Sequence, residues 1–156
     1  MESAIDDLHR ELEAARNEID TLKIKLELSQ QRYINLFENA GDSIFIINLR
    51  GRNIIHANQH ASRRLGYEHH ELIGMTMDDI EILPENSSAN TVSWESSFSG
   101  TQIYECFHLH KDGELIPVEV SSRVVSEGDS TFILQFVRKI IMRKKLENER
   151  EQLIED

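Results

Sequence analysis

The stretch HKDGELIPVEV, residues 110–120, contains a glycine turn followed by a strand with alternating apolar residues. Successive side chains of a strand point to opposite faces of a sheet, so Ile116, Val118 and Val120 share one face. Glu119 then lies on the other face. A sheet face of this composition must be covered by another layer of the protein. The stretch therefore predicts a sheet with a buried inner face.

Two further strands flank this one. The segments TQIYECFHLHK (residues 101–111) and STFILQFVRKI (130–140) are rich in β-branched and aromatic residues, which are common in strands. Short turns containing Gly113 and Gly128 join them to ELIPVEVSSRVV (114–125) and have the composition of hairpin turns. Three consecutive antiparallel strands are expected.

The preceding segments complete the domain. SIFIINLRGRNIIHAN (residues 43–58) has two apolar runs around a glycine turn and predicts a β-hairpin. Residues 58–82 predict short helices that stop at Gly66 and Gly74 and must lie against a sheet. Residues 85–100 are polar and predict a loop that leads to a mobile helix. Strands, short helices and strands again make an α+β domain.

An apolar seam runs along the N-terminal segment, residues 1–31, at alternating spacings of three and four. This heptad pattern predicts a left-handed coiled coil of roughly 50 Å, at about 1.5 Å per residue. A single amphipathic helix packed on its own domain is the alternative. The seam consists of Ile5, Leu8, Leu12, Ala15, Ile19, Leu22 and Leu26.

The charges beside the seam favour a parallel homodimer. In a parallel, in-register pair of helices, Glu11 of one chain meets Arg16 of the other, and Glu18 meets Lys23. Exposed pairs of this kind contribute only a few tenths of a kcal/mol each, so they select orientation while the apolar seam supplies stability.

The composition restricts the partners. A formal net charge of −11 over 156 residues argues against binding to nucleic acid and against direct membrane insertion. The single cysteine, Cys106, excludes an internal disulfide and sites built from several thiolates. No apolar run reaches the length of a bilayer span, and the N-terminus lacks the basic start of a signal peptide. We expect a cytoplasmic location.

Four motifs together resemble the PAS family over residues 32–145: GRNIIHAN, LGYEHHELIG, HKDG and VRKIIMRKKLE. The resemblance implies a five-stranded antiparallel sheet curved around a small cavity that short helices cap. It also implies a sensory or dimerisation module of a larger signalling protein. We assign residues 32–140 to this domain. Residues 141–156 would form a linker helix toward an output domain of a longer parent protein.

The strand that precedes HKDG has an unusual pattern. In the register that the resemblance implies, Phe107 and Leu109 point outward and, with Phe136, form an apolar patch that marks an interface. A register shift of one residue would reverse every direction, and this alternative stays open. The set that faces the cavity in the first register is Tyr104, Cys106 and His108.

The candidate ligand pocket combines inward strand residues with apolar residues of the short helices. A small-molecule ligand would contact their side chains. The members of this predicted pocket are Ile44, Ile46, Ile55, Leu72, Met77, Ile80, Tyr104, Cys106, His108, Val118, Val120 and Ile133.

The cofactor stays undetermined, with haem and flavin as candidates. His108 could ligate haem iron or titrate near neutrality, whereas a lone inward histidine more often hydrogen-bonds within the protein. Flavin photochemistry in light-sensing relatives requires a cysteine that residues 74–83 lack, which leaves noncovalent flavin. No histidine spacing predicts a metal site, and the adjacent His69 and His70 are expected at the surface.

The exit from the domain departs from the family. Lys139, Ile140 and Ile141 stand where many relatives carry Asp-Ile-Thr, so we expect packing of the two isoleucines to couple the last strand to the exit helix. No catalytic motif is present, and a histidine kinase or diguanylate cyclase would supply the output. We predict a sensor that relays cavity occupancy. The alternative is a dimerisation scaffold whose cavity is filled by its own side chains.

Overall fold

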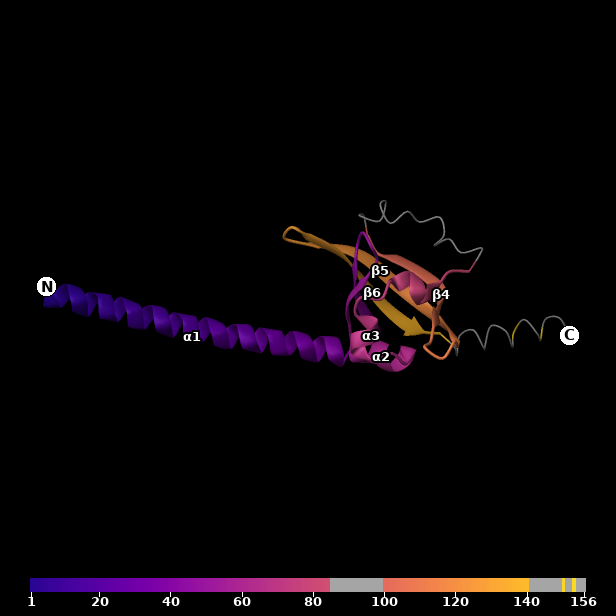
Figure 1. Ribbon diagram of the computed structural model, residues 1–156, viewed down its shortest axis with the longest axis horizontal. Helices are drawn as coiled ribbons and strands as arrows, with labels where there is room; N and C mark the ends of the chain where they lie inside the picture. The colour runs from indigo at the N-terminus through magenta and orange to yellow at the C-terminus, as the bar shows by residue number, and fades with distance from the viewer. Residues whose placement is uncertain (85–99, 141–149, 151–152, 154–156) are drawn as a thin grey trace. The chain divides into compact units, whose positions relative to one another are not determined.

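The computed structural model describes residues 1–84, 100–140, 150 and 153. The chain divides into two compact units, Met1–Phe37 and Glu38–Asp156, and Figure 1 labels their main helices and strands. The predicted loop at residues 85–100 lies outside the described residues except for Gly100. Within the described part of the chain, no helix is both long enough and apolar enough to cross a bilayer.

The first unit is occupied by the long helix α1, Glu2–Glu38, which contains neither glycine nor proline. None of its residues is buried. The isoleucines and leucines of the predicted seam are between 50% and 64% exposed. Two equally exposed residues away from the seam, Ile24 and Leu28, were not part of the prediction.

The second unit is built on a six-stranded antiparallel sheet with the order β2-β1-β6-β5-β4-β3. The expected sheet had five strands. The additional strand β3 has only two residues, which is too short for an alternating pattern to be visible in the sequence. The strands are β1 Ser43–Asn48, β2 Ile54–Ala57, β3 Glu81–Ile82, β4 Gln102–Leu109, β5 Leu115–Glu127 and β6 Ser130–Lys139.

Three short helices lie between β2 and β3, namely α2 Gln59–Leu65, α3 His69–Leu72 and the 3₁₀ helix η1 Met77–Asp79. The side chain of Asn58 caps α2 by accepting a hydrogen bond from the backbone N–H of Ala61. Gly66 ends α2 with a φ of 79°, a left-handed conformation that glycine adopts without strain. The predicted helix stop at Gly66 is confirmed.

The core lies between the inner face of the sheet and these short helices (Figure 1). Phe45, Val118 and Ile133 come from the strands and are completely buried, as are Leu65 and Leu72 from the helices. Burial of such a side chain contributes about 1.5–3 kcal/mol. The short helices are therefore held by the sheet rather than by their own propensity.

The inward residues of β1 differ from the prediction by one position. Ile44 and Ile46 were expected to face the cavity, but Phe45 and Ile47 are the completely buried residues of the core cluster. Ile46 is half-buried, whereas Ile44 is buried, at 7% exposed, but does not belong to the core cluster. Four consecutive apolar residues fit either alternation, so the sequence pattern did not decide which set faces inward.

The same correction applies to β2. Ile55 was placed in the pocket, but its side chain is 39% exposed, whereas Ile54 is 1% exposed. A β-bulge between Ile46 and Ile47 shifts the pairing of β1 with β2. Such a bulge changes which residues share a face and is not visible in an apolar run.

The end of β6 is anchored to the neighbouring strand. The backbone N–H of Ile140 donates a hydrogen bond of 3.1 Å to the carbonyl oxygen of Pro117, and its side chain is 8% exposed. Lys139 is exposed. Ile141 and the exit helix lie outside the described residues, apart from residues 150 and 153, so their role in coupling stays a prediction.

Candidate functional site

The residues that could carry function lie on the inner face of β4. Tyr104, Cys106 and His108 are 8%, 3% and 0% exposed, so the first of the two predicted registers is correct. Phe107 and Leu109 point the other way and are half-buried. Val118 and Val120 of β5 oppose Cys106 and Tyr104 and form the neighbouring part of the inner face.

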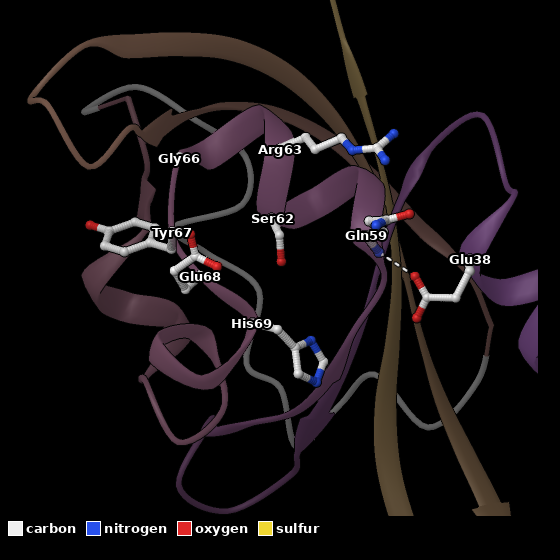
Figure 2. A pocket seen from close by; sticks show the side chains of 8 residues that line it. All are labelled: Glu38, Gln59, Ser62, Arg63, Gly66, Tyr67, Glu68 and His69. Carbon is white, nitrogen blue, oxygen red and sulfur yellow. Dashed lines mark hydrogen bonds between the residues drawn. The ribbon is translucent and has the colours of Figure 1, made fainter.

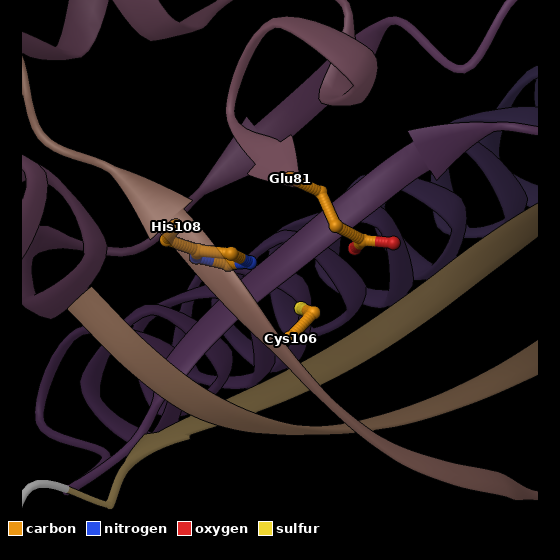
Figure 3. Close-up of side chains that lie close together, drawn as sticks. All are labelled: Glu81, Cys106 and His108. Atoms are coloured by element: carbon orange, nitrogen blue, oxygen red, sulfur yellow. The ribbon is translucent and has the colours of Figure 1, made fainter. Parts of the chain in front are cut away.

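Strand β3 adds a carboxylate to this face. Glu81 pairs with His108 across β3 and β4, and it is 7% exposed. Figure 3 shows Glu81, Cys106 and His108 pointing toward one another from these two strands. Glu81 was not predicted to be buried, because an acidic residue close to Asp78 and Asp79 is expected at the surface.

Glu81 is held by hydrogen bonds. The hydroxyl of Tyr104 donates to both carboxylate oxygens, at 3.0 and 3.1 Å, and the amide nitrogen of Gln135 donates to that hydroxyl at 3.2 Å. An Arg52 guanidinium nitrogen lies 3.7 Å from the carboxylate. Burial raises the pKa of Glu81, and the positive charge of Arg52 opposes that shift.

His108 is held by an arginine from α2. The Nη2 group of Arg64 lies 2.9 Å from His108 Nδ1, and its Nε donates to the Ser43 hydroxyl at 2.8 Å. Because a guanidinium can only donate, Nδ1 accepts this hydrogen bond. Burial and the charge of Arg64 lower the pKa of His108 well below its usual value. The imidazole is therefore neutral and carries its proton on Nε2.

Burial shifts the pKa values of the ionisable groups in this interior toward their neutral forms. Loss of solvation lowers the pKa of Arg64 to about 10. Burial raises the pKa of the Cys106 thiol, and the negative charge of Glu81 raises it further. The sulfur is therefore a neutral thiol at neutral pH when nothing is bound beside it.

Several polar atoms of this interior lack a hydrogen-bond partner within the described residues. His108 Nε2, Gln135 Oε1 and Ser122 Oγ belong to this group, and all three residues are at most 2% exposed. An unpaired buried polar atom costs about 1–3 kcal/mol. Bound water, an ion or a ligand would relieve that cost.

The predicted pocket residues divide into two groups. Ile46 is half-buried and Ile55 is 39% exposed, whereas Ile44 is buried, at 7% exposed, but lies outside the core cluster. That the remaining residues form a ligand pocket stays a prediction. These remaining residues are all buried: Leu72, Met77, Ile80, Tyr104, Cys106, His108, Val118, Val120 and Ile133.

A pocket of about 620 Å³ lies elsewhere, at the surface around α2 (Figure 2). The backbone N–H of Gln59 donates to the Glu38 carboxylate at 2.7 Å on its rim. The pocket shares no residue with the predicted ligand pocket, and His69 at its edge is exposed, as expected. Its lining is Glu38, Gln59, Ser62, Arg63, Gly66, Tyr67, Glu68 and His69.

Comparison with known proteins agrees with the fold. Residues 31–100 match the family model described as PAS domain. Over 124 residues, the chain is 32% identical to the methyl sulfide methyltransferase-associated sensor of Methanosarcina acetivorans. That match covers 78% of this chain but only 12% of the relative's length.

Two solved structures are similar. The PAS domain of an HTR-like protein from Haloarcula marismortui has a TM-score of 0.65 and 24% identity, and the match covers 78% of this chain and 99% of that one. A PAS domain from a two-component sensor histidine kinase has a TM-score of 0.62 and 20% identity, with coverage of 72% and 97%.

Proposed function

This chain belongs to the PAS family, the sensory domains of signalling proteins, and we propose that it acts as a dimeric sensor module within a longer protein. In this proposal, α1 joins two copies as a parallel coiled coil. A change in the interior of the domain shifts the two helices of the dimer between two arrangements. The strand-to-helix junction after Ile140 carries the change toward an output domain.

The exposed seam of α1 is the observation that carries this proposal. Six large apolar residues at heptad positions, from Ile5 to Leu26, are each at least half exposed in a single chain. A helix of 37 residues with this pattern buries its seam when it pairs with a second helix. The charge pattern of Glu11, Arg16, Glu18 and Lys23 supports a parallel pairing.

The nature of the output is part of the proposal. The similarity to a PAS domain of a two-component sensor histidine kinase supports a histidine kinase as the parent, with a diguanylate cyclase as the second choice. Any catalytic step would then take place outside the residues of this chain. The relative with 32% identity is a sensor of which the match spans 12%, which is in keeping with a module of a larger protein.

The dimer contact can be tested with a matched pair of variants. We expect Leu12→Lys combined with Leu22→Lys to convert a dimer into a monomer in multi-angle light scattering, because lysine at seam positions places charges in the interface. Ile24→Lys is the control, because Ile24 is 58% exposed on the same helix but lies off the seam. A dimer that survives the double substitution, or that Ile24→Lys also dissociates, would contradict the coiled coil.

The orientation can be tested by crosslinking. Cys106 is the single cysteine and is buried, so a new cysteine at Leu8 can be followed in a Cys106→Ser background. Residues at the same seam position face each other only in a parallel, in-register dimer. We expect Leu8→Cys to form an interchain disulfide on mild oxidation, which an antiparallel dimer would not allow.

A relay without any ligand is the second candidate. The hydrogen bonds from Gln135 to Tyr104 and from Tyr104 to Glu81 show interior side chains that bond to one another, which supports a self-filled domain. Native mass spectrometry of gently purified protein separates the two candidates. A dimer with extra mass that denaturation releases would support the sensor, and a bare dimer would support the relay.

A further inference from the structure

Three side chains of different chemistry meet in the interior. One oxygen of Glu81, the sulfur of Cys106 and a ring nitrogen of His108 all lie within 4.8 Å of one another, and all three residues are buried. They come from two paired strands, because Glu81 of β3 is directly opposite His108, and Cys106 is two residues earlier on β4. The strand pairing therefore sets their separation.

One of these atoms points into the cluster without a partner. His108 Nε2 makes no hydrogen bond within the described residues, although the residue is 0% exposed. Figure 3 shows the far end of the imidazole directed toward Glu81 and Cys106. Its other nitrogen is occupied by Arg64. A buried histidine nitrogen directed at a thiol and a carboxylate is an arrangement that metal sites share.

We propose that Glu81, Cys106 and His108 bind a transition-metal ion of the zinc class. A carboxylate oxygen, a thiolate sulfur and an imidazole nitrogen are the donors that Zn²⁺ takes in proteins, at about 2.0–2.3 Å each. Three protein ligands leave a fourth position for water or for a small ligand. The site itself rests on this geometry, and its role as the sensed signal rests on the proposed sensor function.

The geometry requires a modest contraction. Ligand atoms around a tetrahedral zinc ion lie roughly 3–4 Å apart, given bond lengths of about 2.0–2.3 Å. The present limit of 4.8 Å therefore calls for side-chain shifts of about 1 Å. Tyr104 already orients the carboxylate through its hydroxyl, a contact of the kind that positions metal ligands.

Metal binding would change the contact with α2. Coordination by Nε2 displaces the proton that this atom carries in the metal-free protein, and a neutral imidazole then carries its proton on Nδ1. Two donors, Nδ1–H and Arg64 Nη2–H, would face each other at 2.9 Å, so Arg64 must turn away from His108. The thiol proton of Cys106 passes to solvent as the sulfur–metal bond forms. Binding of the metal ion would thus change the position of the Arg64 side chain and with it the contact between α2 and β4.

Two arginines limit the affinity. Arg52 lies 3.7 Å from Glu81, and Arg64 contacts His108, so both place positive charge beside the site. Arg64→Met keeps much of the side-chain volume but removes this charge and the competing donor. We expect this variant to bind the metal about tenfold more tightly, the size typical of changes in the shell around a metal site.

Cobalt is the probe, because zinc has no visible spectrum. We expect one Co²⁺ per chain to give a thiolate-to-cobalt charge-transfer band in the near ultraviolet, which added Zn²⁺ abolishes. Since Cys106 is the single cysteine, such a band in the wild-type chain identifies its sulfur as a ligand, even if a variant fails to fold. Cobalt is added both to native protein and during refolding, so that slow entry into the interior does not hide the site.

Variants then identify the other ligands. We expect Glu81→Gln, Cys106→Ser and His108→Ala each to weaken Co²⁺ binding by more than about tenfold, with folding checked by circular dichroism. His69→Ala with His70→Ala is the control, because both residues are exposed and should not matter.

Two results would overturn the site. One is saturating Co²⁺ with no thiolate band. The other is cobalt binding that disappears in the control variant, which would mean an adventitious surface site. Either result leaves the dimeric sensor module untouched, since that proposal is tested by the seam variants of α1.

Discussion

Helix α1 and the inner face of the sheet are opposites in their chemistry. The helix presents leucines and isoleucines that are at least half exposed, whereas the sheet buries Glu81, His108 and Gln135. A continuous stripe of exposed apolar residues and a buried polar group without a hydrogen-bond partner are both unfavourable.

The two regions differ in what would complete them. The seam of α1 needs another apolar surface, which a second copy of the helix would provide in the proposed dimer. The interior needs partners for polar atoms such as His108 Nε2, which only a bound species or water provides. In the proposed function, the helix would serve assembly and the sheet would serve sensing, so changes in one region should leave the other intact.

The largest effect is expected in the core. Phe45→Ala should lower the free energy of unfolding by about 3–5 kcal/mol, because it leaves a cavity among completely buried residues. Urea denaturation measures this change. The control is Ile103→Ala at a position 68% exposed, where we expect less than about 0.5 kcal/mol. Equal losses of stability at both positions would mean that Phe45 does not lie in a close-packed core.

The next effect concerns the junction of α2 with the turn after β4. A Cβ atom at Gly66 would lie 2.6 Å from the ring of His110, whereas one at Gly74 meets nothing within 4 Å. Both glycines have positive φ, so alanine at either should cost about 1–2 kcal/mol. Gly66→Ala should cost a further 1–3 kcal/mol or so from overpacking.

Thermal or urea unfolding of both variants checks this difference. Adding His110→Ala to Gly66→Ala should recover the overpacking part and leave the backbone part. Equal losses for the two glycine variants would show that the contact of α2 with His110 is loose.

A smaller loss of stability is expected when the same tyrosine-to-phenylalanine change is made in the interior of the sheet and, for comparison, on α1. Tyr104→Phe should lower the free energy of unfolding by about 1–3 kcal/mol, because it removes the hydroxyl that donates to the buried Glu81. Tyr33→Phe on α1, at a position 53% exposed, should change it by less than about 0.5 kcal/mol. Urea denaturation in the presence of a chelator measures both. An unchanged free energy of unfolding in Tyr104→Phe would mean that the Glu81 carboxylate has another hydrogen-bond donor.

The smallest effect lies at the surface of the same domain. Lys111 donates to both oxygens of Glu71, at 2.8 and 2.9 Å, and these hydrogen bonds lower the pKa of Glu71. The stability that this pair supplies is present above the ordinary pKa of glutamate and is lost as the pH falls through the lowered value. Lys111→Met should raise the pKa of Glu71 toward its ordinary value.

Carbon-detected NMR titration of the Glu71 carboxyl group measures that change. High salt should reduce the difference between the two proteins, because both groups are solvent-accessible. An unchanged pKa in the variant would assign the shift to the hydrogen bond from the Glu68 backbone instead.

Part of the fold and of the site could be predicted from sequence. The register that the PAS resemblance implied at the HKDG turn placed Tyr104, Cys106 and His108 inside, and the structure agrees with it, although the strand's own pattern left the opposite register open. The all-apolar runs of β1 and β2 carried no alternating pattern, so Phe45 and Ile54 were missed. Alternation is informative only where polar and apolar residues alternate.

The polar partners could not be predicted. Arg64 lies in a short helix after another arginine, and such a residue is expected in solvent. Glu81 belongs to a strand of two residues, which leaves no periodic signal. A buried histidine needs polar partners, and a search for those partners could have pointed to Arg64 and Glu81.

The long heptad helix, the hairpins and the helix stop at Gly66 could be predicted from the order of the amino acids, because these elements depend on residues a few positions apart. The polar contacts of the interior required the folded chain, since Arg64 and His108 are 44 positions apart and Tyr104 and Glu81 are 23 apart. Those contacts exist because the antiparallel pairing and the packing of α2 on the sheet bring the groups together, and no local pattern encodes that distance.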